Sequence, residues 1–255
     1  MNDDQLVLQR LEALVKSNPE FLDDAVFTLM GEIYCRLRRY DEAADAYKKA
    51  VRIKPFSADA QYGLGFVSSL LGRREEAVAA YKEAVRLAPY NSAARFSLGR
   101  EYGLARRYED AITELKETVR LNPADLKAYC LLGLSFLNLS RFAEASEACN
   151  AALARNPNNP ECLYLSGLIS SKMNLLNDAA GYMKRAIIAR PDYESAYTEL
   201  IRIYYLQNKI GELGELKIVL RGVFPHLAEW IDDLLNRGAE TGMDFSEDLY
   251  DLFGG

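Results

Sequence analysis

The chain has 255 residues, of which 49% are hydrophobic and 27% charged, and its formal net charge is −6 at pH 7. A chain of this length and composition can bury a large core, which excludes a disordered protein. The acidic balance argues against nucleic acid as a partner, since proteins that bind phosphate backbones usually carry a basic face.

The N-terminal segment, residues 1–23, begins with Met1-Asn2-Asp3-Asp4, which is acidic where a secretory signal would be basic, and no apolar run follows these residues. No later stretch is long and uncharged enough to span a bilayer. We therefore expect a cytoplasmic chain without direct membrane insertion. Within this segment, Asp4 to Lys16 places leucines and a valine on one helical face, which predicts an amphipathic N-terminal capping helix.

Residues 24–227 carry three residue types in phase at a constant interval of 34 residues. The phased residues are prolines (Pro55, Pro89, Pro123, Pro157, Pro191, Pro225), glycines (Gly31, Gly65, Gly99, Gly133, Gly167) and alanines (Ala43, Ala77, Ala111, Ala145, Ala179). Each interval divides into two segments with apolar residues at helical spacing, such as Ala25 to Leu37 and Asp41 to Ile53. The sequence therefore predicts six helix-turn-helix units, at 24–57, 58–91, 92–125, 126–159, 160–193 and 194–227.

The phased glycines need a structural reason, because a glycine inside a helix costs about 1 kcal/mol relative to alanine. We interpret them as positions where the second helix of a unit packs closely against the first, opposite the phased alanines. Each proline ends its unit, since proline disfavours helix in the residue before it. Between the two helices, cations precede acids, as in Arg38-Arg39-Tyr40-Asp41-Glu42, an order that suits both helix dipoles.

This pattern closely resembles the tetratricopeptide repeat (TPR) family over roughly residues 24 to 225. The aromatic residues that match the family are Tyr34, Tyr102, Phe136 and Tyr204 in first helices and Tyr47 and Tyr81 in second helices. Gln61 and Arg95 depart from it, because a bulky apolar residue is usual at their position. The resemblance implies an all-α fold, a right-handed superhelical solenoid of stacked helix-turn-helix repeats.

The sixth unit is degenerate. Ile201, Leu213 and Leu220 replace its small residues, and Gly211 and Gly214 are expected to interrupt its second helix. A degenerate terminal repeat is typical of a solenoid end, because the last repeat has a neighbouring repeat on one side only. Residues 228–239 then predict a C-terminal capping helix.

Residues 240–255 form an acidic aromatic tail with five carboxylates and no cation. Its large apolar residues share one face of a short helix: Phe245, Leu249, Leu252 and Phe253. The tail resembles a short docking motif, and a further capping helix is the alternative. As a docking motif it would bind in a groove of its own chain or of a neighbouring chain.

The sequence offers little for catalysis. His226 is the only histidine, which excludes histidine-based triads and multi-histidine metal sites. The four cysteines show no CxxC spacing, and free thiols are expected at Cys35, Cys130, Cys149 and Cys162. We predict no catalytic residue, no metal and no cofactor, and we expect that the protein is not an enzyme.

The resemblance also implies a concave groove, lined by the first helices, that receives partner peptides. The residues that map to it are Tyr62, Phe66, Phe96, Arg100, Cys130, Leu134, Tyr164, Leu168 and Arg202. This row is mostly apolar, with Arg100 as an isolated cation in its middle. Thr28 and Glu32 stand where a carboxylate-clamping branch of the family has lysine and asparagine, so that clamp is not expected. Alternatively, the apolar residues only fill space between adjacent helices.

The function predicted from these features is that of an interaction scaffold or adaptor. It would bind extended or amphipathic segments of protein or peptide partners in the groove. One alternative is a chaperone-like protein that shields a hydrophobic client segment before assembly or secretion. Another is a non-catalytic targeting subunit of an enzyme complex.

Overall fold

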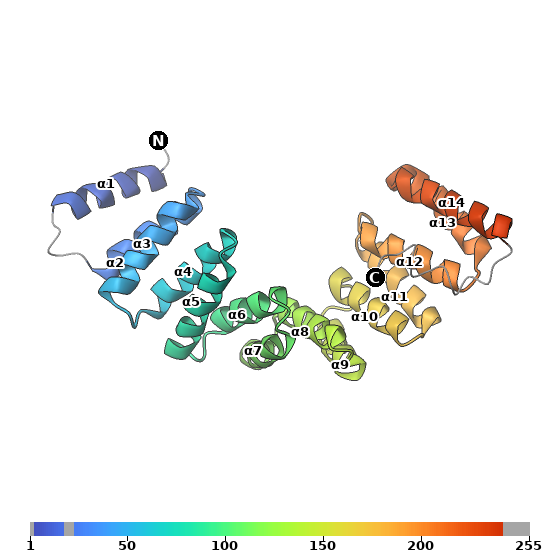
Figure 1. Cartoon of the computed structure of the whole chain (residues 1–255), viewed down its shortest axis with the longest axis horizontal. Coiled ribbons are helices and arrows are strands. Elements are labelled where there is room, and N and C mark those ends of the chain that lie inside the picture. Colours follow the sequence, from blue (N-terminus) through green and yellow to red (C-terminus); the bar gives the residue numbers. More distant parts are fainter. Residues whose placement is uncertain (1–2, 18–22, 242–255) are drawn as a thin grey trace. The chain divides into compact units, whose positions relative to one another are not determined.

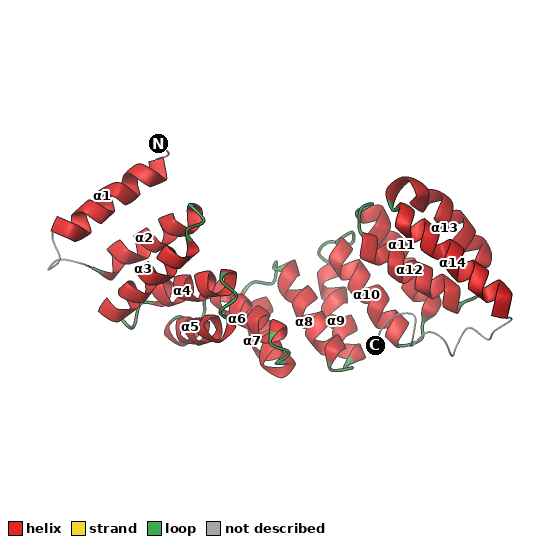
Figure 2. Cartoon of the chain, turned by 45° about the horizontal axis from the view of Figure 1, so that its top comes forward, coloured by secondary structure: helices red, strands yellow, loops and turns green. Residues whose placement is uncertain are grey.

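The computed structural model describes the backbone of residues 3–17 and 23–241, and side chains up to residue 236. These ranges hold fourteen α-helices and no strand (Figure 2), which confirms the all-α prediction. The helices are α1 (Asp3–Ser17), α2 (Asp24–Arg36), α3 (Tyr40–Ile53), α4 (Ala58–Leu70), α5 (Arg74–Leu87), α6 (Ser92–Leu104), α7 (Tyr108–Leu121), α8 (Leu126–Asn138), α9 (Phe142–Leu153), α10 (Pro160–Lys172), α11 (Leu176–Ala189), α12 (Glu194–Leu206), α13 (Ile210–Val223) and α14 (Pro225–Thr241).

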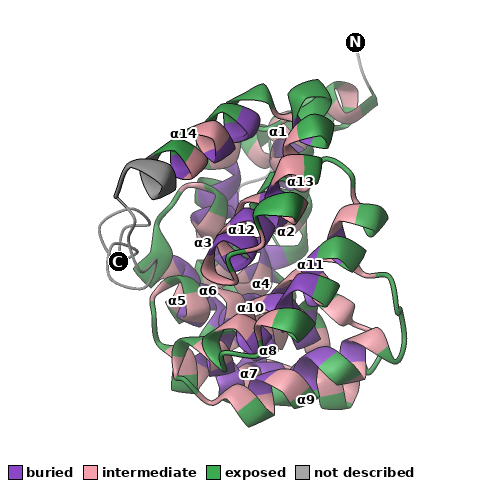
Figure 3. Cartoon of the chain, turned by 90° about the vertical axis from the view of Figure 1, so that its right-hand side faces the viewer, coloured by how far each residue is buried: buried purple, intermediate pink, exposed green. Residues whose placement is uncertain are grey.

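The chain divides into two compact units, residues 1–135 and 136–255. In the first unit, α2 lies beside α3, α4 beside α5 and α6 beside α7 (Figure 1). In the second unit, α10 packs against α11 and α13 against α14. Helices carry buried residues on the sides where they face one another and exposed residues on the other side (Figure 3).

A left-handed residue joins the two helices of a pair. Positive φ angles recur every 34 residues, at Arg38, Gly72, Arg106, Ser140, Asn174 and Asn208. The next residue donates its backbone N–H back across the turn, from Arg39 to the Tyr34 carbonyl and from Arg107 to the Tyr102 carbonyl, both at 2.8 Å. This is the Schellman arrangement, which satisfies carbonyl groups at the helix end. The backbone of the turns therefore repeats with the period of the sequence.

The cations and acids at these turns pair with one another. Arg39 Nε lies 2.9 Å from Glu42 Oε1, and Arg107 Nη2 lies 2.6 Å from Asp110 Oδ2. Arg39 also lies over the Tyr34 ring, 4.7 Å from its centroid. The acids belong to the first turn of the second helix, as the sequence predicts, but exposed pairs of this kind contribute only about 0–1 kcal/mol each.

Four of the phased glycines, Gly31, Gly65, Gly99 and Gly167, are positions of close approach. A Cβ on Gly31 would lie 2.7 Å from Tyr47 Cζ, and one on Gly99 would lie 2.8 Å from Leu115 Cγ. Both distances are too short for real carbon contacts, which confirms the predicted reason for these glycines. The facing group is chiefly this large side chain of the second helix, while Ala111, a phased alanine, contributes its backbone oxygen at 3.4 Å from the Gly99 position.

Arg95 explains one departure from the family pattern. Its Nη1 lies 2.6 Å from Glu114 Oε2, and its Nε donates to the Pro89 carbonyl at 2.8 Å. Both ion-pair partners are largely buried between α6 and α7. A buried ion pair therefore occupies the place where an apolar contact is usual.

Helix α1 packs against α2 through both apolar and polar contacts. Leu8 is buried, and the Tyr34 hydroxyl donates to Glu12 Oε1 at 2.8 Å. Arg36 donates to both carboxylate oxygens of Asp4, at 3.0 and 2.7 Å. These contacts lie where the sequence predicts an N-terminal capping helix.

The predicted interruption of the sixth unit's second helix is wrong, because α13 runs unbroken from Ile210 to Val223. Leu213 and Leu220 are fully buried and hold the helix in place, which outweighs the poor helix propensity of two glycines. Gly211 and Gly214 have open space where a side chain would be.

Helix α14 begins at Pro225, three residues before the predicted capping helix. Proline is well suited to the first turn of a helix, so Pro225 both follows α13 and opens α14. Ile231 and Leu234 are buried, and Lys217 of α13 forms an ion pair with Asp232.

The cysteines differ from one another. Cys35 and Cys149 are free thiols, as expected. Cys130 and Cys162 are each in a disulfide and not free, which corrects the expectation of free thiols at these two positions. Sequence spacing gave no signal for this, because disulfide geometry depends on the distance between Cα atoms and not on a local motif.

Candidate peptide-binding surface

The predicted groove residues of the first unit lie on first helices of their pairs. We call these residues, with their counterparts in the second unit, the first-helix surface. In the first unit they are Tyr62 and Phe66 of α4, Phe96 and Arg100 of α6, and Cys130 and Leu134 of α8. Members of the same helix are four residues apart, so their side chains lie on one face.

Exposure differs along this row. Phe66 is 40% exposed and Leu134 42%, whereas Tyr62 and Phe96 are half-buried. The Tyr62 ring lies 5.7 Å from that of Tyr81 in α5, so it partly fills space within its own helical pair. Phe66 and Leu134 instead present apolar surface to solvent, which a partner can cover.

Arg100 is not the isolated cation that the sequence suggested. Its Nη2 donates to Ser69 Oγ at 3.0 Å and to Glu101 Oε1 at 3.1 Å, and the Ser69 hydroxyl donates to the same carboxylate oxygen at 2.6 Å. The Glu101 side chain is only 3% exposed, whereas that of Arg100 is 40% exposed. A buried carboxylate thus fixes a guanidinium whose outer part reaches solvent.

The second unit repeats this arrangement at the equivalent repeat position. Arg202 of α12 donates from Nη2 to Ser171 Oγ at 3.1 Å and from Nε to Glu199 Oε2 at 3.0 Å. Arg202 and Ser171 each follow Arg100 and Ser69 by three repeat lengths in the sequence. In each unit, therefore, an arginine of a first helix donates to a serine of the preceding first helix and to a nearby glutamate.

The remaining residues of the second unit are half-buried. Tyr164 and Leu168 lie one turn apart in α10, and the Tyr164 ring is 5.1 Å from that of Tyr193. Burial raises the pKa of the Tyr164 hydroxyl, so this group stays neutral at physiological pH. Tyr164 therefore offers ring surface and a hydroxyl, and no charge.

Sequence reasoning missed the groups that hold the two arginines. Serine stands at this repeat position only in the unit before each arginine, at Ser69 and Ser171, and this coincidence was a usable signal. The two glutamates gave no such signal, because Glu101 follows its arginine directly whereas Glu199 precedes its arginine by one turn.

The described residues show no cluster of three or more histidine, cysteine or acidic side chains that could hold a metal ion. No helix within the described ranges is long and apolar enough to cross a membrane. The tail motif of Phe245, Leu249, Leu252 and Phe253 lies outside the described residues, so its docking stays a prediction.

Comparison with family models gives three matches. Two models of the tetratricopeptide repeat match residues 58–91 and 96–160, and a TPR repeat model matches residues 31–72. None of the curated protein sequences matches the chain.

Solved structures share the fold. YrrB, described as a TPR protein with an unusual peptide-binding site, is 22% identical and covers 73% of this chain and 95% of its own, with a TM-score of 0.66. PilF of Pseudomonas aeruginosa is 22% identical over 79% of this chain and 92% of its own, with a TM-score of 0.64. MamA of Desulfovibrio magneticus RS-1 is 20% identical and covers 67% of this chain and 96% of its own, with a TM-score of 0.63.

The family matches and the shared fold agree with the helical pairs, the phased glycines and the repeated turns. Proteins built from these repeats are in general scaffolds for protein interactions, with protein or peptide partners. The chain belongs to the tetratricopeptide repeat proteins.

Proposed function

We propose that the chain holds extended or amphipathic segments of partner proteins on its first-helix surface. The observation that carries the proposal is the combination, on one unit, of exposed Phe66 and Leu134 with the fixed guanidinium of Arg100. The TPR fold itself indicates a protein-interaction scaffold, and YrrB, which shares that fold, is described as having a peptide-binding site.

The chemistry of this surface defines the ligand. Covering a large apolar side chain stabilises a complex by about 1.5–3 kcal/mol when burial is complete. Arg100 already neutralises Glu101, so it serves a ligand mainly as an oriented hydrogen-bond donor. The matching segment has large apolar residues and a carboxylate or carbonyl oxygen that reaches Arg100.

The chain's own tail has this chemistry. Residues 240–255 combine acids with Phe245, Leu249, Leu252 and Phe253. We therefore take the tail, from the same or a neighbouring chain, as the first candidate ligand.

A binding experiment tests the proposal. The chain shortened after Thr241 keeps α14 and is titrated with a labelled synthetic peptide of residues 240–255. We expect saturable binding that Phe66→Ser weakens about tenfold, because an apolar anchor is lost. Phe56→Ser is the matched control, since Phe56 is 72% exposed in the loop between α3 and α4.

If Phe56→Ser and Phe66→Ser weaken binding equally, or if the peptide does not bind, the tail is not a ligand of this surface. The mass of the full and shortened chains by sedimentation then tells whether the tail joins neighbouring chains. A loss of oligomers on shortening supports docking between chains.

A chaperone-like role would use the same exposed apolar residues. It predicts that co-expression keeps an insoluble client in solution and that Phe66→Ser abolishes this protection. A targeting subunit would instead purify with an enzyme at fixed stoichiometry.

A further inference from the structure

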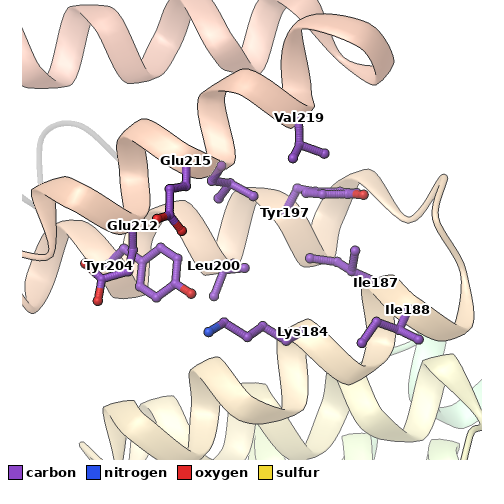
Figure 4. Close-up of a pocket in the computed structure, with 10 residues that line it drawn as sticks. Lys184, Ile187, Ile188, Tyr197, Leu200, Tyr204, Glu212, Glu215 and Val219 are labelled. Carbon is purple, nitrogen blue, oxygen red and sulfur yellow. The ribbon is translucent and has the colours of Figure 1, made fainter.

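The second unit holds a pocket of about 350 Å³ between α11, α12 and α13 (Figure 4). It is lined by the second helices α11 and α13 and by one flank of the first helix α12, and none of its lining residues belongs to the first-helix surface. We call it the outer pocket. Most of its wall is apolar, from Ile188 of α11, Leu200 of α12, and Leu216 and Val219 of α13.

Packing in the last repeat explains why this pocket exists. Where other first helices have a glycine that the second helix closely approaches, α12 has Ile201, which is fully buried. Leu213 and Leu220 of α13 are likewise fully buried at positions that alanine holds in most of the other pairs. This added volume between the two helices leaves part of the α12 flank uncovered, and the outer pocket opens there.

The rim of the outer pocket carries aliphatic residues where other repeats carry charges. Ile188 is 80% exposed and Val219 is 55% exposed. At the position of Ile188 the first three repeats have arginine, and at that of Val219 they have charged residues: Arg52, Arg86, Arg120, Lys49, Glu83 and Glu117. Exposed apolar residues gathered in one place are typical of an interaction surface.

At the polar end of the pocket, an ion pair that is present in the first unit is not formed between the equivalent residues. In the first unit, Lys48 Nζ of α3 lies 2.7 Å from Glu76 Oε1 of α5. The equivalent residues four repeats later are Lys184 and Glu212. Here Lys184 turns instead to Tyr204, with Nζ 5.5 Å from the ring centroid (Figure 4).

The acids at this end are left without an ion pair. Lys209, the other nearby cation, donates to Asn177 Oδ1 at 3.2 Å. Within the described part of the chain, Glu212 and its neighbour Glu215 form no ion pair. The Tyr204 hydroxyl, and after it the charges of Glu212 and Glu215, raise the pKa of Lys184, so the lysine stays charged and interacts with both acids without forming an ion pair.

We propose that the outer pocket binds an amphipathic helix of a partner protein, with aliphatic side chains on one face and a lysine or arginine about one turn beyond them. The aliphatic residues enter between Ile188 and Val219, and the cation meets Glu212 as Lys48 meets Glu76. The pocket suits a helix because one face of α13, from Glu212 to Val219, runs along it for about two turns. The acidic tail has the wrong charge for this site.

Two synthetic peptides test this inference on the full chain by fluorescence anisotropy. Each has about 15 residues, long enough for some helix in water, and a leucine face. One carries lysines at its polar positions and the other carries glutamates at the same positions. We expect the lysine peptide to bind with a Kd about tenfold lower than the glutamate peptide, because only its cations complement the two glutamates.

Variants locate the binding. Ile188→Ser and Val219→Ser are each expected to weaken binding of the lysine peptide about tenfold, as for anchor contacts. Glu212→Gln is expected to remove most of the preference for the lysine peptide over the glutamate peptide. Ile53→Ser is the matched control, because Ile53 is also exposed on a second helix but lies in the first unit. Both changes in the pocket affect exposed side chains, and thermal unfolding checks that the fold is kept.

Several results would overturn the inference. These are equal affinity for both peptides, no binding, or binding that Ile188→Ser leaves unchanged. If the lysine peptide binds more strongly only after residues 242–255 are removed, the tail is the ligand of the pocket. If the Ile188→Ser variant without peptide has a lower mass by sedimentation than the unchanged chain, the ligand is a second copy of the chain.

Discussion

At the scale of single residues, the turns show how one backbone conformation recurs with different side chains. The left-handed position holds Gly72 once, but arginine at Arg38 and Arg106. A residue with a Cβ is disfavoured there by about 1–2 kcal/mol, whereas glycine is not. The sequence predicted where the turns are from their charges, but not this conformation, because its usual marker, glycine, is present in only one of them.

Replacing Arg106 by glycine is therefore expected to stabilise the first unit by about 0.5–1 kcal/mol, since relief of strain exceeds the entropy cost of glycine. The Arg106 side chain is exposed, so its removal costs few stabilising contacts. The urea midpoint of the full chain measures the change. Gly72→Ala is the converse variant and should lower the midpoint, and a fall in both variants would contradict the account of the turns.

Two glycines of α6 give a matched pair of tests for close approach. Gly99 faces Leu115, whereas nothing lies within 4 Å of a Cβ on Gly103. Gly99→Ala should destabilise the fold by about 1–3 kcal/mol through overpacking. Gly103→Ala should be neutral or stabilising by up to about 1 kcal/mol, because alanine favours helix. Equal effects on thermal unfolding would show that Gly99 has no packing role.

At the scale of helices, periodicity predicted the segments well. The segments Ala25 to Leu37 and Asp41 to Ile53 correspond within one residue to α2 and α3. The error at Gly211 and Gly214 arose because propensity acts locally, whereas the buried leucines of α13 act through tertiary packing. The outer pocket was not predicted either, since it depends on how far apart bulky residues keep two helices.

The same repeat position should respond in opposite ways in different pairs. At Ile201 of α12, Ile201→Ala removes buried volume and should destabilise the second unit by about 2–5 kcal/mol. An added methyl group at Gly99 is harmful instead. Ile218→Ala is the control, because Ile218 is largely exposed on α13. Chemical denaturation that places Ile201→Ala within about 0.5 kcal/mol of this control would refute the proposed packing of the last repeat.

At the scale of the whole molecule, the row of the first-helix surface followed from the resemblance to the family together with the repeat spacing. Its exposed residues, Phe66 and Leu134, were on the predicted list, and so was Arg100. The environment of Arg100 was only partly predictable: the position of Ser69 was a signal, but its contact with Arg100 forms between successive first helices, and the adjacent Glu101 gave no signal. The repeat positions therefore define the proposed binding surface, and the packed structure shows which of its side chains are exposed.

The most direct test of peptide binding on the first-helix surface is a photo-crosslinking experiment. A peptide of residues 240–255 carrying a benzophenone side chain in place of Phe245 is irradiated with the chain shortened after Thr241, and mass spectrometry locates the linked residues. We predict links in the first helices of the first unit, chiefly α4 and α6, that excess unlabelled peptide suppresses. Links confined to second helices such as α5 and α7, or links that excess peptide does not suppress, would contradict the proposed binding surface.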